Sequence, residues 1–230
     1  MNRNLEKLED ILGFKFKNKD FLRSALVHRS YLNEHKGFVL EHNERLEFLG
    51  DAVLELSVTD FLYNNYSEAE GVLTNWRSSL VNGERLAQIA EELGVYNYLY
   101  LSRGEAQDTN QKARNYILAN AFEAMIGAMY LDQGYDAAEA FVEKYLFPKT
   151  EEIMRNKLWR DPKSTLQEKV QEAEGETPYY SVVRETGPDH DKQFIVGVYV
   201  KDMLLAQGSG KSKQEAEQDA ARNALEEKGW

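Results

Sequence analysis

The spacing of the apolar residues changes once along this chain, and that change limits the folds the chain can adopt. Between Leu5 and about Trp159, apolar residues recur every three or four positions, while the strict alternation of a half-buried strand is hard to find. Two such rows are Leu46, Leu49, Val53 and Leu56, and Ile117, Ala121, Ala124 and Ala128. Residues three and four apart share one face of a helix, so we predict an all-α N-terminal part.

The pattern changes after the sequence Trp159-Arg160-Asp161-Pro162. An Asp followed by Pro is typical of a helix start, because the aspartate caps the helix and proline fits its first position. We therefore predict two domains, one over residues 1–158 and a second over residues 161–230.

The second domain mixes helical and strand-like patterns. Its expected elements are a helix with Leu166, Val170 and Ala173 inside, strands within 180–184, 194–200 and 201–207, and a last helix with Ala216, Ala220, Ala221 and Leu225 inside. Ser212 and Glu215 have the spacing of a capping box, which opens that last helix. The predicted fold class is an all-α domain followed by a small α+β domain of order α-β-β-β-α.

Composition restricts the chemistry and the location. The 230 residues include no cysteine, so a disulfide framework and a thiolate metal site are both excluded, and any metal must be bound through oxygen or imidazole. No segment has the length and apolarity of a signal peptide or a membrane span, which predicts a cytoplasmic protein without a membrane partner. The net charge of −11 argues against a uniformly basic nucleic-acid surface. Whether the chain can bind nucleic acid therefore depends on where its charges are clustered.

An acidic cluster lies on the same predicted helix as the first apolar row, on a different face. On a helix, Glu44, Glu47 and Asp51 share one face, where like charges are mutually unfavourable unless solvent, a basic partner or a hard cation neutralises them. Mg²⁺ prefers oxygen ligands and keeps several of its waters, which suits a sparse carboxylate cluster. The alternative is a solvated acidic face with no ligand.

A second polar pair interrupts an otherwise apolar helix. Asn120 and Glu123 lie one turn apart within residues 118–127. A carboxylate among core-facing residues needs compensation for its desolvation, which makes a purely structural role harder to accept. The pair and the acidic row can complete one site.

Several motifs together resemble the ribonuclease III family, and they cover nearly the whole chain. In the helical part these are Asn43-Glu-Arg-Leu-Glu-Phe-Leu-Gly-Asp51, preceded by Ala25-Leu-Val-His-Arg-Ser-Tyr31 and followed by Glu70-Gly71 and Phe122-Glu-Ala-Met-Ile-Gly127. The C-terminal part is similar to the double-stranded-RNA-binding domain through residues 163–168, 187–190, 208–213 and 216–221.

The resemblance implies roles for the acidic residues. Glu47, Asn120, Glu123 and Asp51 correspond to the family's metal-site positions, with Asp51 and Glu123 as the principal catalytic acids. Glu44 and Glu70 correspond to auxiliary positions near the dimer interface and the RNA. The family often has Asp where this chain has Asn120, whose amide oxygen is a neutral and weaker ligand.

The resemblance also implies an activity. A homodimer that uses Mg²⁺, with Mn²⁺ as an alternative ion, would cut double-stranded RNA and leave 5′-phosphate and 3′-hydroxyl ends with short 3′ overhangs. Precursors of ribosomal RNA and some messenger and transfer RNA transcripts would be its substrates. The competing hypothesis is a protein that binds double-stranded RNA through a silent dimeric helical domain, and Asn120 is the feature that favours it.

In the C-terminal domain the resemblance implies contacts at two ends. Ser164, Gln167 and Glu168 on the first helix, together with His190 in the Gly-Pro loop, would reach successive minor grooves of A-form RNA. Lys211 and Lys213 at the start of the last helix would bind phosphate with the free backbone N–H groups there, and Lys201 can lie nearby. Without the surrounding motifs, the lysines indicate only a solvated helix end and the histidine only a surface loop.

Overall fold

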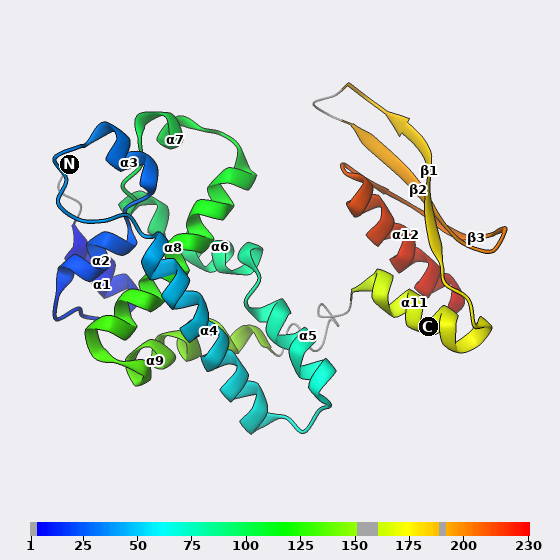
Figure 1. Ribbon diagram of the computed structural model, residues 1–230, viewed down its shortest axis with the longest axis horizontal. Coiled ribbons are helices and arrows are strands. Elements are labelled where there is room, and N and C mark those ends of the chain that lie inside the picture. Colours follow the sequence, from blue (N-terminus) through cyan, green and yellow to red (C-terminus); the bar gives the residue numbers. More distant parts are fainter. Residues whose placement is uncertain (1–3, 151–160, 189–191) are drawn as a thin grey trace. The chain divides into compact units, whose positions relative to one another are not determined.

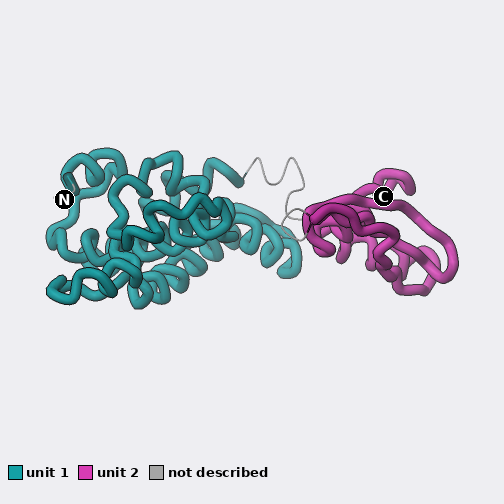
Figure 2. The backbone as a smooth tube through the Cα atoms, turned by 90° about the horizontal axis from the view of Figure 1, so that it is seen from above, with its two compact units in different colours: residues 1–159 teal, residues 160–230 magenta. Residues whose placement is uncertain are grey.

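The computed structural model describes residues 4–150, 161–188 and 192–230. The chain divides into two compact units, residues 1–159 and 160–230, coloured separately in Figure 2. The predicted boundary between residues 158 and 161 falls largely within 151–160, which lie outside the described ranges, so it stays a prediction. Each unit is therefore considered by itself.

In the described part of the N-terminal unit, the regular secondary structure is helical apart from a single bridge between Val27 and Tyr100. Its α-helices are α1 (Leu5–Leu12), α2 (Lys19–Ala25), α3 (Arg29–Glu34), α4 (Glu44–Asn65), α5 (Glu70–Leu80), α6 (Gly83–Glu92), α7 (Arg103–Gln107), α8 (Gln111–Gln133) and α9 (Tyr135–Tyr145). Two 3₁₀ turns, η1 (Val95–Tyr98) and η2 (Phe147–Lys149), complete it. In the described part of the chain, no helix is long and apolar enough to cross a membrane.

The two longest helices, α4 and α8, pack against each other in the middle of this unit (Figure 1). Helix α8 has 23 residues and is buried on nearly every side between Ile117 and Met129. A helix that is apolar all round is expected at the centre of a fold. On α4 the predicted inner row is only partly right, because Val53 is buried while Leu56 is 56% exposed.

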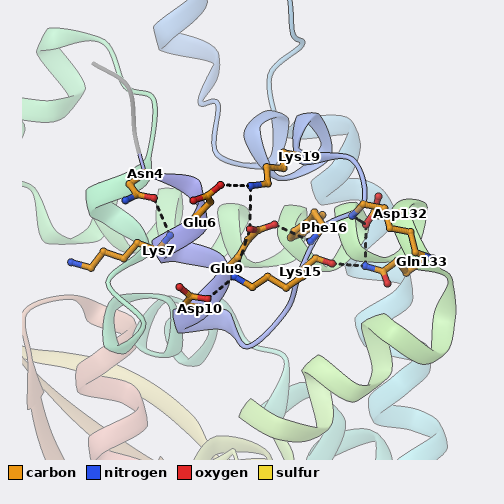
Figure 3. Close-up of polar contacts among 11 residues, drawn as sticks. Asn4, Glu6, Lys7, Glu9, Asp10, Lys15, Phe16, Lys19, Asp132 and Gln133 are labelled. Atoms are coloured by element: carbon orange, nitrogen blue, oxygen red, sulfur yellow. Dashed lines mark hydrogen bonds and ion pairs between the residues drawn. The ribbon is translucent and has the colours of Figure 1, made fainter.

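A buried carboxylate fixes the turn between α1 and α2. Glu9 is only 2% exposed and accepts a hydrogen bond from the backbone N–H of Phe16 at 2.9 Å. Lys15 and Lys19 lie 3.9 and 3.6 Å from its other oxygen and supply the positive charge that a buried carboxylate requires (Figure 3). Glu9 is therefore a structural residue.

The same turn is attached to the end of α8. The Asp132 carboxylate accepts hydrogen bonds from the backbone N–H groups of Lys17 and Asn18 at 2.7 and 2.9 Å. The side chain of Gln133 donates to the carbonyl oxygen of Lys15 at 2.7 Å (Figure 3). The N-terminal turn thus depends on α8, the helix that carries Asn120 and Glu123.

The C-terminal unit has the predicted order of helix, three strands and helix. Its elements are α11 (Pro162–Glu174), β1 (Tyr179–Thr186), β2 (Gln193–Val200), β3 (Met203–Gly210) and α12 (Lys213–Lys228). The sheet is antiparallel in the order β1-β2-β3. Both helices pack on one face of it, around a core of Leu166, Val170, Val198, Val200, Leu205 and alanines of α12 (Figure 1).

The local signals for this unit are mostly confirmed. Asp161 caps α11 by accepting from the backbone N–H groups of Lys163 and Ser164, each at 3.3 Å. The third strand begins two residues later than predicted, because Lys201 has a φ of 52° and forms the tight turn after β2 with Asp202. The whole length of β3 separates that turn from the start of α12, so Lys201 does not lie near Lys211 and Lys213.

Candidate functional site

Two glycines allow α4 and α8 to touch backbone to backbone. A Cβ atom on Gly50 would overlap the carbonyl oxygen of Glu123, and one on Gly127 would overlap the carbonyl oxygen of Leu46. Only glycine permits so close an approach. Sequence reasoning noted both glycines within motifs but gave them no role, although a glycine inside a long helical pattern was a usable signal.

This contact brings the predicted polar residues of the two helices together. Between Ile117 and Met129, Asn120 and Glu123 are the only residues of α8 that are not buried. They meet Glu47 and Asp51, which lie on either side of Gly50 on α4. The Asn120 amide lies beside the carboxylate of Glu47 and favours its charged form, and the charges of Asp51 and Glu47 act on Glu123.

The carboxylates of this cluster repel one another in a partly desolvated place. Burial, followed by the charges of Asp51 and Glu47, raises the pKa of Glu123 to about 7. Burial and the charge of Glu44 likewise raise the pKa of Glu47, against the opposing effect of the Asn120 amide. Among the residues that the structure describes, no positive charge acts on Glu47 or Glu123, and a cation bound there would relieve the repulsion.

The donor set fits a hard divalent ion that keeps part of its hydration shell. It consists of oxygen atoms from two facing helices, with one neutral amide among carboxylates. Among the residues that the structure describes, no three histidine, aspartate or glutamate side chains converge closely enough to hold a metal by themselves. Mg²⁺ is compatible with that arrangement because it binds through one or two carboxylates and retains several waters.

The two auxiliary glutamates lie at different ends of α4. Glu44 begins the helix and is 3.2 Å from Arg29 and 3.8 Å from His42, next to the main cluster. Glu70 begins α5 and accepts a hydrogen bond from Thr74 at 3.0 Å, in a cavity of about 410 Å³ that is also lined by Tyr63 near the other end of α4. Tyr63 lies twelve residues beyond Asp51, about 18 Å along the helix. Within one copy of the chain, Glu70 is therefore too far away to join the cluster.

The predicted contact face of α11 is open to solvent. Ser164, Gln167 and Glu168 are all exposed on the side of the helix away from buried Leu166 and Val170. The Ser164 hydroxyl donates to the capping carboxylate of Asp161 at 2.7 Å, which fixes its position. His190 lies outside the described residues.

At the start of α12, a carboxylate occupies part of the expected anion site. Ser212 caps the helix as predicted, but Glu215 reaches back to the backbone N–H of Lys211 at 2.8 Å. Lys211 and Lys213 are both exposed, and the ammonium of Lys213 lies 5.9 Å from the centre of the Phe194 ring. A phosphate bound here would rely on the lysine side chains more than on the N–H of Lys211.

Comparison with known proteins gives each unit a class. Residues 18–150 match the Ribonuclease-III-like family model, and residues 162–228 match the double-stranded RNA binding motif. The nuclease domain of ribonuclease III from Campylobacter jejuni is similar in structure, with a TM-score of 0.55 and 39% identity over 63% of this chain and 99% of that one. The fold and site therefore define a helical nuclease-like unit followed by a double-stranded-RNA-binding unit.

Similarity over the full length identifies the family. Ribonuclease 3 of Bdellovibrio bacteriovorus is 45% identical over 99% of this chain and 97% of its own length. Ribonuclease 3 of Pelotomaculum thermopropionicum is 46% identical over 96% of this chain and 92% of its own length. The chain belongs to the ribonuclease III family.

Proposed function

We propose that this protein is an endoribonuclease that hydrolyses double-stranded RNA with the help of Mg²⁺ or Mn²⁺. The observation that carries the proposal is the cluster of Glu47, Asp51, Asn120 and Glu123, where carboxylates from two helices meet without a neutralising charge. The family relationship and the double-stranded RNA binding motif support this class of substrate. Cleavage would leave 5′-phosphate and 3′-hydroxyl ends with short 3′ overhangs.

The four side chains of the cluster have complementary tasks in this proposal. Glu47, Asp51, Asn120 and Glu123 would hold the ion, which when bound supplies activation of a water and charge stabilisation at the scissile phosphate. Asp51 is exposed and its charge acts on Glu123, which supports a proposal in which the two acids orient the attacking water and accept its proton. The close packing of α4 on α8 at Gly50 and Gly127 would hold the set in position before substrate arrives.

A cleavage assay tests this assignment. Purified protein is incubated with labelled RNA duplex, the corresponding single strand and a DNA duplex, each with and without Mg²⁺. We expect cutting of the RNA duplex alone, only with the ion, and products with 5′-phosphate ends. Glu123→Ala should abolish cutting while RNA binding stays nearly intact, and Glu143→Ala, at an exposed site on α9, should change neither. A Glu123→Ala variant that cuts at the normal rate would place the chemistry elsewhere.

The competing function is binding of double-stranded RNA without cleavage. It is favoured by Asn120, because an amide brings no charge to the ion site. It predicts tight duplex binding and no products at any Mg²⁺ concentration. We favour the enzyme because Glu47, Asp51 and Glu123 are held close together at a desolvation penalty that a purely structural helix pair does not require.

We further propose that the protein acts as a homodimer through its helical unit, in the cytoplasm, on precursors of ribosomal RNA and on structured messenger and transfer RNA transcripts. Phe48 is 81% exposed and Val39 94% exposed beside a groove of about 790 Å³. Apolar side chains that line the groove include Phe21, Leu40, Leu46, Leu49 and Leu131. A two-fold axis would let each Phe48 enter the groove of the other copy and place two sites on one duplex.

The dimer is tested by light scattering at micromolar concentration. We expect twice the chain mass for the natural protein and the single mass for Phe48→Asp, since the carboxylate removes the apolar surface that Phe48 would bury and costs desolvation on entering the groove. The monomeric variant should lose double-strand cleavage. A stable monomer of the natural sequence that cuts both strands would contradict the dimer.

A further inference from the structure

An exposed aromatic side chain lies directly beside the acidic cluster. Tyr116 is 67% exposed and precedes Asn120 by four residues and Glu123 by seven on α8. Positions separated by four and seven residues share one face of a helix, so all three side chains emerge on the same side. The sequence interpretation assigned no role to Tyr116.

Between Tyr116 and Met129, the open surface of α8 is a single strip along this face. From Ile117 to Met129 the helix is otherwise buried, and at Gly127 the strip closes against the backbone of α4. In the other direction it continues through Tyr116 to the exposed Lys112, one further turn away. Tyr116 is about 6 Å along the axis from Asn120, and Lys112 about 12 Å.

The chemistry of the strip changes along its length. Carboxylates at its closed end repel phosphate unless a cation is bound, whereas the ammonium of Lys112 attracts it. Tyr116 lies between them with an aromatic ring and a hydroxyl that can donate and accept. A-form RNA presents ribose surfaces and 2′-hydroxyl groups across its wide minor groove. A tyrosine side chain suits these groups better than it suits a phosphate, because it offers a ring and a neutral hydroxyl.

We propose that Tyr116 is a substrate-positioning residue that recognises ribose next to the bond that is cut. Its ring packs on the sugar, its hydroxyl hydrogen-bonds the 2′-hydroxyl of that nucleotide, and Lys112 contacts a phosphate one turn further on. The inference rests on the proposed function, because it assumes that the duplex lies over the acidic cluster. It adds a residue that distinguishes RNA from DNA at the cutting site itself.

The test combines a protein variant with modified substrates in the full chain. Tyr116→Phe keeps the ring and removes the hydroxyl, and duplexes carry one 2′-deoxy nucleotide at successive positions near the cut. For the natural protein, one such substitution should lower kcat/KM by about three- to tenfold, the effect of one hydrogen bond between neutral groups. In Tyr116→Phe that same substitution should have no further effect, because the partner is already missing.

A matched control is Tyr130→Phe, a 37% exposed tyrosine on the same helix beyond the contact with α4. It should retain the natural pattern of sensitivity to the deoxy substitutions. Tyr116→Ala removes the ring as well and should raise KM further while the circular dichroism spectrum stays unchanged. If Tyr116→Phe responds to every deoxy substitution as the natural protein does, the assignment is overturned. If the natural protein does not cut duplex RNA at all, the proposed function fails instead.

Discussion

Glu123 makes the stability of the metal-free protein depend on pH. Its pKa is raised from 4.5 to about 7 in the folded state, so folding disfavours the charged form. The resulting loss of stability is absent well below pH 4.5 and complete above about pH 7. Lowering the pH from 8 toward 5 should therefore relieve it.

The matching prediction concerns Glu123→Gln, which removes the charge and keeps the shape. At pH 8 without divalent ions, this variant should be more stable than the natural protein by about 1–2 kcal/mol, allowing for solvent screening of a partly exposed group. The melting temperature of the helical unit should rise by roughly 3–6 °C. Calorimetry at pH 8 and pH 5 measures this, and a difference that does not shrink at pH 5 would show that the charge is not its cause.

If the proposed ion site is right, residue 120 influences the ion concentration that cleavage requires. If its amide oxygen is a ligand, Asn120→Asp adds a negative charge and should lower the Mg²⁺ concentration for half-maximal cleavage by about tenfold, corresponding to roughly 1.4 kcal/mol. Titrating Mg²⁺ against the cleavage rate of both proteins measures this. Identical curves would remove residue 120 from the ligand set, and a natural protein that is inert until Asn120→Asp is made would favour the binding function.

At the residue scale, sequence could predict which side chains form the cluster but not their electrostatic state. The spacing of Glu47 and Asp51 placed them on one face of a helix, and Glu123 stood out in an apolar stretch. The raised pKa of Glu123 depends on its contact with a different helix, which no local pattern contains. The sequence equally could not show that Glu70, on α5, lies beside the C-terminal end of α4 and so far from Asp51.

At the scale of elements, the contact between α4 and α8 determines the geometry of the cluster. Gly50→Ala would place a methyl group against the backbone of Glu123, where no flexible side chain can move away. We expect a loss of several kcal/mol in stability and of nearly all cleavage, because the two halves of the site are pushed apart. Gly83→Ala is the matched control, since its nearest neighbour would be Ala119 Cβ at 3.8 Å, an ordinary contact. Thermal melting and cleavage assays on both variants test this prediction. An active, stable Gly50→Ala protein would contradict it.

The types of the elements were predictable because their patterns are local. Which face of each helix is buried was harder to predict. The capping signals at Asp161 and Ser212 were confirmed by their hydrogen bonds. Leu56 and Ala173 were predicted to face inward and are exposed. A helical pattern identifies an apolar stripe, but which part of the stripe meets another element depends on the lengths and placement of its neighbours.

At the scale of the molecule, binding and chemistry should be separable. A chain that ends before Asp161 should stay folded and dimeric but bind duplex RNA poorly at physiological salt. In the full chain, Lys211→Ala and Lys213→Ala should each flatten the dependence of log affinity on log salt by up to about one unit, because each lost phosphate contact releases about one fewer counterion. Lys7→Ala, at an exposed site on α1, is the control and should leave the slope as it is. An unchanged slope in both α12 variants would move the phosphate contacts elsewhere.

The hydrogen bonds from Lys17 and Asn18 to Asp132 also set an order of events during synthesis. The partners of the first bond are 115 positions apart in sequence. At about 5–20 residues per second, the carboxylate is made roughly 6–23 s after the turn that needs it. Until then the two backbone N–H groups remain hydrated, and the turn between α1 and α2 lacks its attachment to α8. Synthesis therefore has to reach the end of α8 before this turn can take its final position.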